Sequence, residues 1–224
     1  LVTPLVTIGV GVGLSAWWAP ALGKAAMKVG SVIMWATDLQ PFFMGILVSV
    51  FVGIALTLPI SSAAICAALG LTGLAGGAAV AGCCAQMVGF AVMSFRENKW
   101  GGLVSQGIGT SMLQMGNIVR NPRIWIAPIV TSAITGPIAT CLFRLQMNGT
   151  AVSSGMGTCG FVGQIGVYTG WMNDIAEGTK TAVTAMDWAG LFLISFILPA
   201  VLCPLINMFV RKLGWVKDGD MTLS

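Results

Sequence analysis

The stretch from Phe42 to Val52, which reads FFMGILVSVFV, decides the fold class of this chain. It carries no charge and is apolar on every side, whereas a strand of a membrane barrel would alternate apolar and polar residues over about ten positions. Backbone amides surrounded by lipid must be paired within their own helix or in a closed barrel. The stretch therefore predicts a helix inside a membrane.

Long runs without a charged residue recur along the whole chain. Only 8% of the 224 residues are charged and 56% are hydrophobic, whereas about a quarter of a soluble domain is charged. The charged residues leave six uncharged runs: Leu1–Gly23, Leu39–Phe95, Trp100–Val119, Ile124–Phe143, Leu145–Asn173 and Trp188–Val210. Each run is long enough to cross a hydrocarbon layer of about 30 Å, which takes about 20 helical residues. The runs exclude a core fragment of a soluble protein and predict an all-α, polytopic transmembrane bundle.

We expect residues 1–224 to form a single transmembrane domain. The first residue is Leu and no basic leader precedes the first apolar run, so this run does not have the pattern of an intact signal peptide. We expect the full-length protein to carry further helices before Leu1.

Tryptophan and basic residues predict how the chain lies in the membrane. All eight Trp stand at the edges of the runs, where indoles prefer the headgroup level: Trp17, Trp18, Trp35, Trp100, Trp125, Trp171, Trp188 and Trp215. Lys and Arg collect on the cytoplasmic side. The best arrangement places nine basic residues inside, namely Lys24, Lys28, Arg96, Lys99, Arg120, Arg123, Arg211, Lys212 and Lys217, and two outside, Arg144 and Lys180.

This topology predicts the course of the first part of the chain. Residues 1–18 read as an inward helix, and residues 22–38 as an amphipathic helix at the interface. Pro41 opens a crossing that we expect to run outward and to end near Leu58. For residues 61–95 we expect a half-helix to about Gly70, a break at Gly73, Gly76 and Gly77, and an inward helix.

Two later runs should return to the side from which they start. The run 100–119 has basic residues of the inner side at both ends, and the run 145–173 has outer residues at both ends. Both contain a G-x-G-T element followed by a Gln: Gly107–Thr110 with Gln114, and Gly155–Thr158 with Gln164. Many transporters build central sites from discontinuous segments in oppositely oriented repeats. The pair predicts re-entrant segments and is compatible with an inverted repeat; the alternative is that these glycines only allow close helix packing.

The side chains available for a central site are neutral and polar. The chain contains no His, and its six Cys lie in apolar runs without a C-x-x-C pair, so we expect no metal site and no cofactor. The candidate substrate-binding residues are Ser61, Ser62, Gln86, Thr110, Gln114, Asn117, Ser154, Thr158 and Gln164. Buried amides and hydroxyls need partners, so each of these residues either bonds to another helix or contacts a hydroxyl-rich substrate.

Several stretches resemble one family of membrane proteins. They are Leu39–Val50, Leu56–Ala64, Gly82–Val92, Gly107–Thr110, Asn117–Ile126, Gly155–Gly157 and Gly214–Lys217. These stretches are similar to PfoR-type membrane proteins, which are classed with the IIC, sugar-translocating subunits of the bacterial phosphoenolpyruvate-dependent phosphotransferase system (EIIC type 2).

The resemblance implies a multi-pass permease of the bacterial inner membrane. It would bind a sugar or polyol within the bilayer, form a homodimer and work with soluble IIB and IIA subunits, without binding nucleic acid. The phosphate would come from the soluble partner, so the chain would not be catalytic by itself. Better-known IIC branches use His and Glu near the sugar, and this chain has no His and no Glu in the middle of an apolar run. The alternative is therefore a membrane-embedded regulator or sensor without transport activity.

Overall fold

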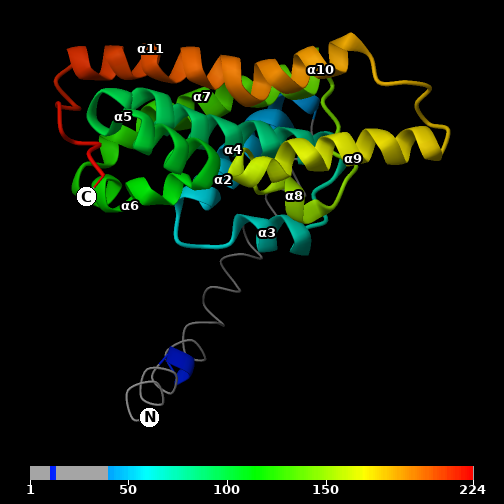
Figure 1. Ribbon diagram of the computed structural model, residues 1–224, viewed down its shortest axis with the longest axis horizontal. Helices are drawn as coiled ribbons and strands as arrows, with labels where there is room; N and C mark the ends of the chain where they lie inside the picture. The colour runs from blue at the N-terminus through cyan, green and yellow to red at the C-terminus, as the bar shows by residue number, and fades with distance from the viewer. Residues whose placement is uncertain (1–10, 14–39, 224) are drawn as a thin grey trace.

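A computed structural model describes residues 11–13 and 40–223 of the chain. The two helices predicted over residues 1–18 and 22–38 lie mostly or wholly outside the described residues. The described part consists of helices and loops, and it contains no β-strand apart from a single bridge between Gly73 and Met147 (Figure 1). The predicted all-α class is confirmed.

The helices follow one another with few long loops. In chain order the α-helices are α2 (Pro41–Thr57), α3 (Ser62–Ala68), α4 (Gly73–Met93), α5 (Phe95–Val104), α6 (Met115–Arg120), α7 (Ile126–Pro137), α8 (Ala151–Ser154), α9 (Val162–Ala176), α10 (Ala185–Phe192) and α11 (Leu198–Lys212). Short π- or 3-10-helical turns join or extend them: η1 (Ser105–Gly109), η2 (Ser111–Gln114), η3 (Pro122–Trp125), η4 (Ile138–Leu142), η5 (Cys159–Phe161) and η6 (Leu193–Ile197).

Within the described residues, three helical stretches are long and apolar enough to cross a membrane. They are Gly73–Met93, Pro122–Leu142 and Ala185–Lys212, and the apolar helix Pro41–Thr57 is shorter. The first three correspond to runs that the sequence analysis predicted as crossings. The chain is therefore an integral membrane protein.

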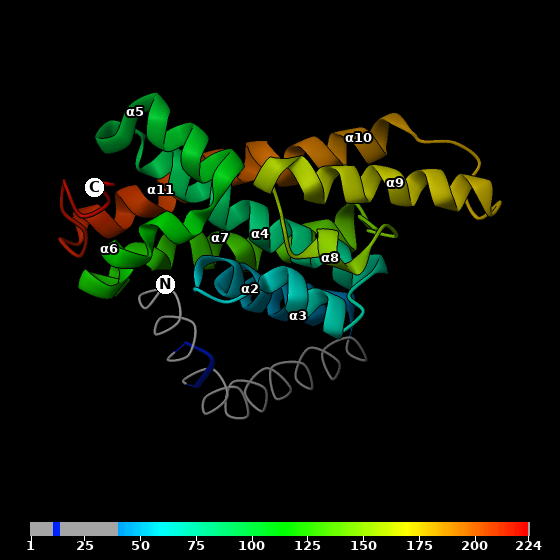
Figure 2. The same ribbon diagram turned by 60° about the horizontal axis from the view of Figure 1, so that its bottom comes forward.

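Helix α4 forms the centre of the bundle and packs against α2, α7 and α11 (Figures 1 and 2). Nearly all of its side chains are buried. The sequence permits this because α4 is rich in Gly and Ala, and small residues let helix backbones approach closely. Gly82 marks the close approach to α2: a Cβ atom there would overlap the backbone carbonyl of Ser49.

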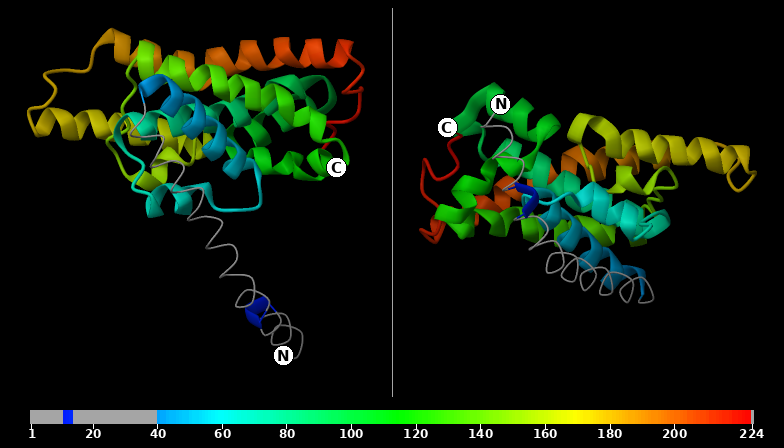
Figure 3. Two further views of the ribbon diagram at one scale, coloured as in Figure 1. Left: turned by 180° about the vertical axis from the view of Figure 1, so that it is seen from behind. Right: turned by 90° about the horizontal axis from the view of Figure 1, so that it is seen from below.

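The direction of α2 corrects one prediction. Pro41 lies beside the far end of α7, where its carbonyl accepts a hydrogen bond from Thr140 Oγ1 (2.8 Å), and Thr57 at the other end of α2 contacts Gln86. Helix α2 therefore runs parallel to α4, so the predicted outward crossing from Pro41 is wrong (Figure 3). The physical reason is that α2 has no charged residue at either end, so the distribution of basic residues could not orient it.

The loop after α2 leads into α3, which packs against α8. The break before α4 lies at Leu69–Thr72, slightly earlier than predicted, and Gly70 and Gly73 have positive φ angles of 59° and 62°. Gly76 and Gly77 were expected in this break, but they lie inside α4. They are small because the backbone of Met147 and Leu145 passes directly over them.

The two ends of the bundle differ in charge. Helices α5, α6 and the last turn of α11 meet at one end, which carries every described basic residue that was predicted to lie inside (Figure 1). We call it the basic end. At the opposite end lie the loop 143–149, the end of α9 and the loop 177–184, with Arg144 and Lys180. Their separation agrees with the predicted sorting of basic residues.

At the basic end, the segment 213–223 is bound along α5 and α6. Glu97 accepts hydrogen bonds from the backbone N–H of Met221 (2.9 Å) and Gly219 (3.2 Å) and pairs with Arg211 (2.9 Å). The Asn98 side chain donates to the Met221 carbonyl and accepts from the Leu223 N–H, both at 2.8 Å. The Met221 side chain is fully buried. The segment 213–223 thus ties the ends of α5 and α6 to α11.

Replacing Glu97 with Gln should release this segment. Its carboxylate is mostly buried and serves three donors at once, and hydrogen bonds to charged groups are the stronger ones. We expect hydrogen–deuterium exchange of the Gly219 and Met221 amides to accelerate by about tenfold or more. The matched control is Asp218→Asn, since Asp218 also pairs with Arg211 but its side chain is 91% exposed. Equal exchange in both variants would contradict the role assigned to Glu97.

Candidate functional site

The first predicted broken segment enters the bundle and leaves it at the basic end. Helix α5 and turn η1 lead inward to Gly109, Thr110 is extended (φ −159°, ψ 141°), and η2 and α6 lead back. At the starting end Asn98 holds Met221, and at the returning end the Asn117 side chain donates to the carbonyl of Thr222 (3.0 Å). The helix is therefore interrupted at the G-x-G-T element.

The second broken segment enters and leaves at the opposite end. Its starting loop and its final helix α9 are joined there by Asn148, whose side-chain amide donates to both carboxylate oxygens of Asp174 (2.9 Å each). Between them, the short helix α8 is followed by turns over residues 155–158 and by η5. This G-x-G-T element also interrupts its segment.

Two residues of the second break have backbone conformations that are unusual for their position. Gly157 has φ 53°, and a Cβ atom there would meet Cys83 at 2.6 Å, so only glycine fits this turn. Phe161 has φ 58° although it is not glycine. Such strain costs on the order of 1 kcal/mol or more and persists only where the surrounding structure imposes it, often at ligand sites.

The two breaks meet at the middle of α4. Turn η1 of the first segment packs against η5 of the second. Cys83, Cys84 and Met87, near the midpoint of α4, contact residues at or just after the second break. The first break approaches α4 slightly further along the helix: a Cβ atom at Gly107 would lie 3.4 Å from Ala91, and Ser111 is linked to Gln86 through Thr57. Because α4 is long enough to span a membrane, its midpoint would lie near the bilayer centre. We call the polar side chains around this point the central site.

On the side of the first broken segment, the polar contacts of the central site are centred on Gln86. Its Oε1 accepts hydrogen bonds from Trp125 Nε1 (2.9 Å) and Thr57 Oγ1 (3.2 Å), and Thr57 shares a hydrogen bond with Ser111 Oγ beside the first break (2.9 Å). Gln86 is fully buried, yet its Nε2 has no hydrogen-bond partner among the described residues. A buried N–H group without a partner costs about 1–3 kcal/mol, so this donor is available to a ligand.

On the side of the second broken segment, the central site contains two further unpaired groups. Gln164 on α9 donates through Nε2 to Cys84 Sγ (3.3 Å), whereas its buried Oε1 has no partner among the described residues. Ser195 Oγ in η6 is likewise buried and unpaired there. Thr158, at the second break, is fully buried and donates to Met87 Sδ (3.5 Å). These neutral polar groups lie on two faces of α4. Gln86 faces Thr57 and Trp125, whereas Cys84, two residues earlier and about 200° around the helix, faces Gln164.

The other predicted residues fall into two groups. Ser62 and Ser154 lie by the second break, where they donate to the carbonyls of Gly155 and Ala151 (2.7 Å each), while Thr110 caps η2 and the exposed Ser61 caps α3. Gln114 and Asn117 lie at the basic end. The amide of Gln114 donates to Gln106 (2.9 Å) and to the carbonyl of Met221 (3.0 Å), and its oxygen accepts from Asn117 (2.8 Å). The structure thus brings Gln86, Thr158 and Gln164 to the middle of α4, and it engages Gln114 and Asn117 in holding the segment 213–223.

Four residues of the central site were not among the candidates. They are Thr57, Ser111, Trp125 and Ser195. Thr57 and Ser195 are isolated polar residues in apolar stretches, which is the only signal that could have identified them. Trp125 was interpreted as an interfacial anchor, but its indole N–H is used by Gln86.

Fold and site together define a class of protein: a helical membrane protein in which two interrupted segments enter from opposite ends and meet at the midpoint of a spanning helix. The sequence model of the family described as "Phosphotransferase system, EIIC" matches residues 1–223. The chain therefore belongs to this family and is a membrane component of a phosphotransferase-system sugar permease. Neither the curated proteins nor the solved structures gave a match.

Proposed function

We propose that this protein is a sugar-translocating IIC subunit that binds a neutral sugar or polyol at the central site. The observation that carries the proposal is that the two breaks contact each other and both pack against the second half of α4, from Cys83 to Ala91. Irregular backbone at membrane depth is tolerated only where protein buries it or where it lines a cavity. Two such breaks in contact with each other, each entering from a different end, favour a site for a ligand that crosses the bundle.

The chemistry of the central site indicates the class of ligand. Gln86 Nε2 is a free donor, Gln164 Oε1 is a free acceptor, and Ser195 Oγ can do either. No Asp, Glu, Lys or Arg is among these residues, and an uncompensated charge would be very costly to bury there. A molecule rich in hydroxyl groups, each both donor and acceptor, matches such a set.

The residues present indicate which steps this chain performs and which steps fall to a soluble subunit. The chain has no His, so it cannot carry a phosphohistidine. In the proposed mechanism its own residues bind and orient the sugar, and a soluble IIB subunit supplies the phosphate from the basic end. The glycines of the two G-x-G-T elements are suited to act as hinges, because the helices are already interrupted there. A hinge motion at either element would open the central site toward the end from which that segment enters.

Binding of carbohydrates to the purified full-length protein tests the proposal. We expect at least one member of a panel of neutral mono- and disaccharides and polyols to bind in detergent or nanodiscs, as measured by calorimetry. An acidic sugar such as glucuronate should bind more weakly than its neutral parent because the central site holds no cation. Absence of binding across the panel, with intact helical circular dichroism, would refute the proposal.

The alternative function is a membrane regulator or sensor without transport activity. The binding of Gln114 and Asn117 by the segment 213–223 favours it, because a bound segment at the basic end would suit signalling to a partner. A deletion strain separates the two functions. Lost sugar uptake with unchanged gene expression indicates a permease, whereas the reverse result indicates a regulator.

A further inference from the structure

We propose that the end of the bundle opposite to the basic end carries a second, shallower carbohydrate site, through which the sugar reaches the central site. This inference rests on the proposed function and extends it. It concerns a cavity of about 460 Å³, which we call the vestibule. The residues that line it include Arg144, Gln146, Trp171, Asp174, Glu177 and Lys180.

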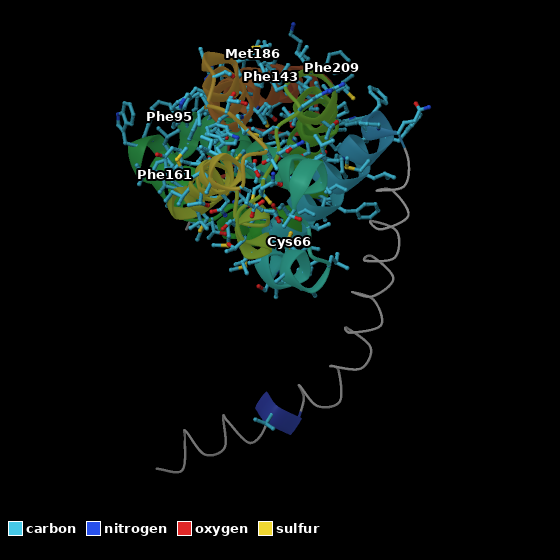
Figure 4. All side chains as sticks on the ribbon, turned by 90° about the vertical axis from the view of Figure 1, so that its right-hand side faces the viewer. Cys66, Phe95, Phe143, Phe161, Met186 and Phe209 are labelled. Carbon is cyan, nitrogen blue, oxygen red and sulfur yellow. The ribbon has the colours of Figure 1, made fainter. Side chains whose placement is uncertain are left out.

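The starting loop and the final helix of the second broken segment both contribute to the vestibule. One wall is the loop that follows η4, the second is the outer end of α9, and the third is the loop leading to α10 (Figure 1). Figure 4 looks onto this end of the bundle, with Phe143 of the vestibule labelled near Met186 at the start of α10. A volume of this size is within the range that holds small organic ligands.

Several polar groups in the vestibule are held rigidly. The carboxylate of Asp174 is fixed by the Asn148 amide, with both oxygens at 2.9 Å. Lys180 forms an ion pair with Asp187 (2.7 Å) and also lies 5.3 Å from the centre of the Trp171 ring. Groups that are positioned in advance lose less entropy when a ligand binds.

Other groups in the vestibule are free to meet a ligand. The carboxylate of Glu177, the guanidinium of Arg144 and the amide nitrogen of Gln146 line the cavity, and none has a hydrogen-bond partner among the described residues. Together they offer two donors and an acceptor. Carboxylates and guanidinium groups can each engage two neighbouring hydroxyls, which is the arrangement that a sugar or polyol presents.

The charge of the lining favours a neutral ligand over an ion. Arg144 and Lys180 contribute two positive charges, and Asp174, Glu177 and Asp187 contribute three negative ones, so the formal sum is 2 − 3 = −1. Two of these charges already neutralise each other in the Lys180–Asp187 pair. Such a mixed lining provides no strong net field for an anion or a cation, but it provides many hydrogen-bonding positions.

The vestibule is separate from the central site but connected to it by α9. From Val162 beside the second break to Asp174 in the vestibule, twelve helical steps correspond to about 18 Å. A row of aromatic rings covers this distance: Trp171 contacts Trp188 (5.3 Å between centroids), followed by Phe192 (6.1 Å), Phe196 (6.2 Å) and Phe161 at the second break (6.3 Å). These rings, of which Trp188, Phe192 and Phe161 are exposed, follow the outer face of the bundle between the two sites.

The test is transport into liposomes by the full-length protein, with the sugar offered from either side. The test variant is Gln146→Ala/Glu177→Ala, which removes the free Gln146 amide nitrogen and the free Glu177 carboxylate. It also removes the hydrogen bond from Asn148 to the Gln146 oxygen (3.3 Å), but it leaves the Asn148–Asp174 and Lys180–Asp187 contacts in place. We expect it to raise the half-saturating sugar concentration about tenfold from the vestibule side, with an unchanged maximal rate and unchanged transport from the basic side. The control Asp218→Ala removes an exposed acid at the basic end and should change neither value from the vestibule side.

A second measurement isolates the vestibule from the central site. In a Gln86→Leu/Gln164→Leu background, weak binding of the same sugar should persist and should disappear when Gln146→Ala/Glu177→Ala is added. If the unaltered protein transports the sugar but the vestibule variant behaves like it from both sides, the vestibule inference is overturned and the proposed function stands. If the unaltered protein neither binds nor transports any sugar in the panel, the proposed function fails and the vestibule inference fails with it.

Discussion

Replacing Gln86 and Gln164 together with Leu is expected to abolish sugar transport and to weaken binding at the central site by about 30- to 100-fold. Each Leu removes one of the unpaired amide groups that would serve the ligand, Gln86 Nε2 and Gln164 Oε1. Gln86→Leu also removes the acceptor of Trp125 Nε1 and Thr57 Oγ1, so binding is compared only in variants that keep the helical circular dichroism of the unaltered protein. Two lost hydrogen bonds in a dry site, each contributing about 1–1.5 kcal/mol, correspond to this factor. Calorimetric titration of the sugar that binds the unaltered protein measures the effect.

The matched control is Gln114→Leu. Gln114 is equally buried, but its amide is fully used by Gln106, Asn117 and the carbonyl of Met221. We expect this variant to lose stability at the basic end and to retain sugar affinity. If Gln114→Leu weakens binding as strongly as the double variant, or if transport survives the double variant, the ligand does not bind at the middle of α4.

The second large effect is expected for Gly82→Val, which should prevent the bundle from packing. A Cβ atom at Gly82 would overlap the backbone carbonyl of Ser49, and a backbone atom cannot move aside as the tip of a long side chain can. Ser49 is itself held between α2 and α7, where its hydroxyl donates to the carbonyl of Ser132 (2.7 Å). Overpacking a tight core typically costs about 1–3 kcal/mol, and here we expect a value at or above the upper end.

Thermal unfolding in detergent, with the remaining folded protein measured by size-exclusion chromatography, reports the loss of stability in Gly82→Val. We expect the midpoint to fall by about 10 °C or the folded protein to be absent. The control is Gly116→Val on α6, where no atom lies within 4 Å of the added Cβ. A bundle that tolerates Gly82→Val as well as Gly116→Val would show that α2 and α4 do not pack as described.

The broken segments were predictable because charge and composition act locally. Basic residues at Arg96 and Arg120 flank one run, and outer residues flank the other, so neither run could cross the membrane simply. Each G-x-G-T element then supplies glycines that weaken a helix at a definite place. The structure interrupts both segments at these elements.

The direction of α2 and the membership of the central site were less accessible. No charge marks either end of α2, so its orientation depends on the fit of Gly45, Ser49 and Gly53 against α4 and α7. In the same way, Gln86 and Gln114 have the same side chain and the same burial, and the sequence gives no reason to treat them differently. Only their neighbours distinguish a paired amide from an unpaired one.

The sequence by itself determined that this protein is a helical membrane protein, that two of its segments break at the G-x-G-T elements and which end is basic. These properties follow from the energy of placing each residue in lipid or in water, which depends on the residue and its close neighbours in the chain. The tertiary structure decided that the two breaks meet beside the second half of α4, that Gln114 binds the segment 213–223 and that a polar vestibule forms around Trp171. These features depend on contacts between residues far apart in the chain, which are fixed only when the helices pack.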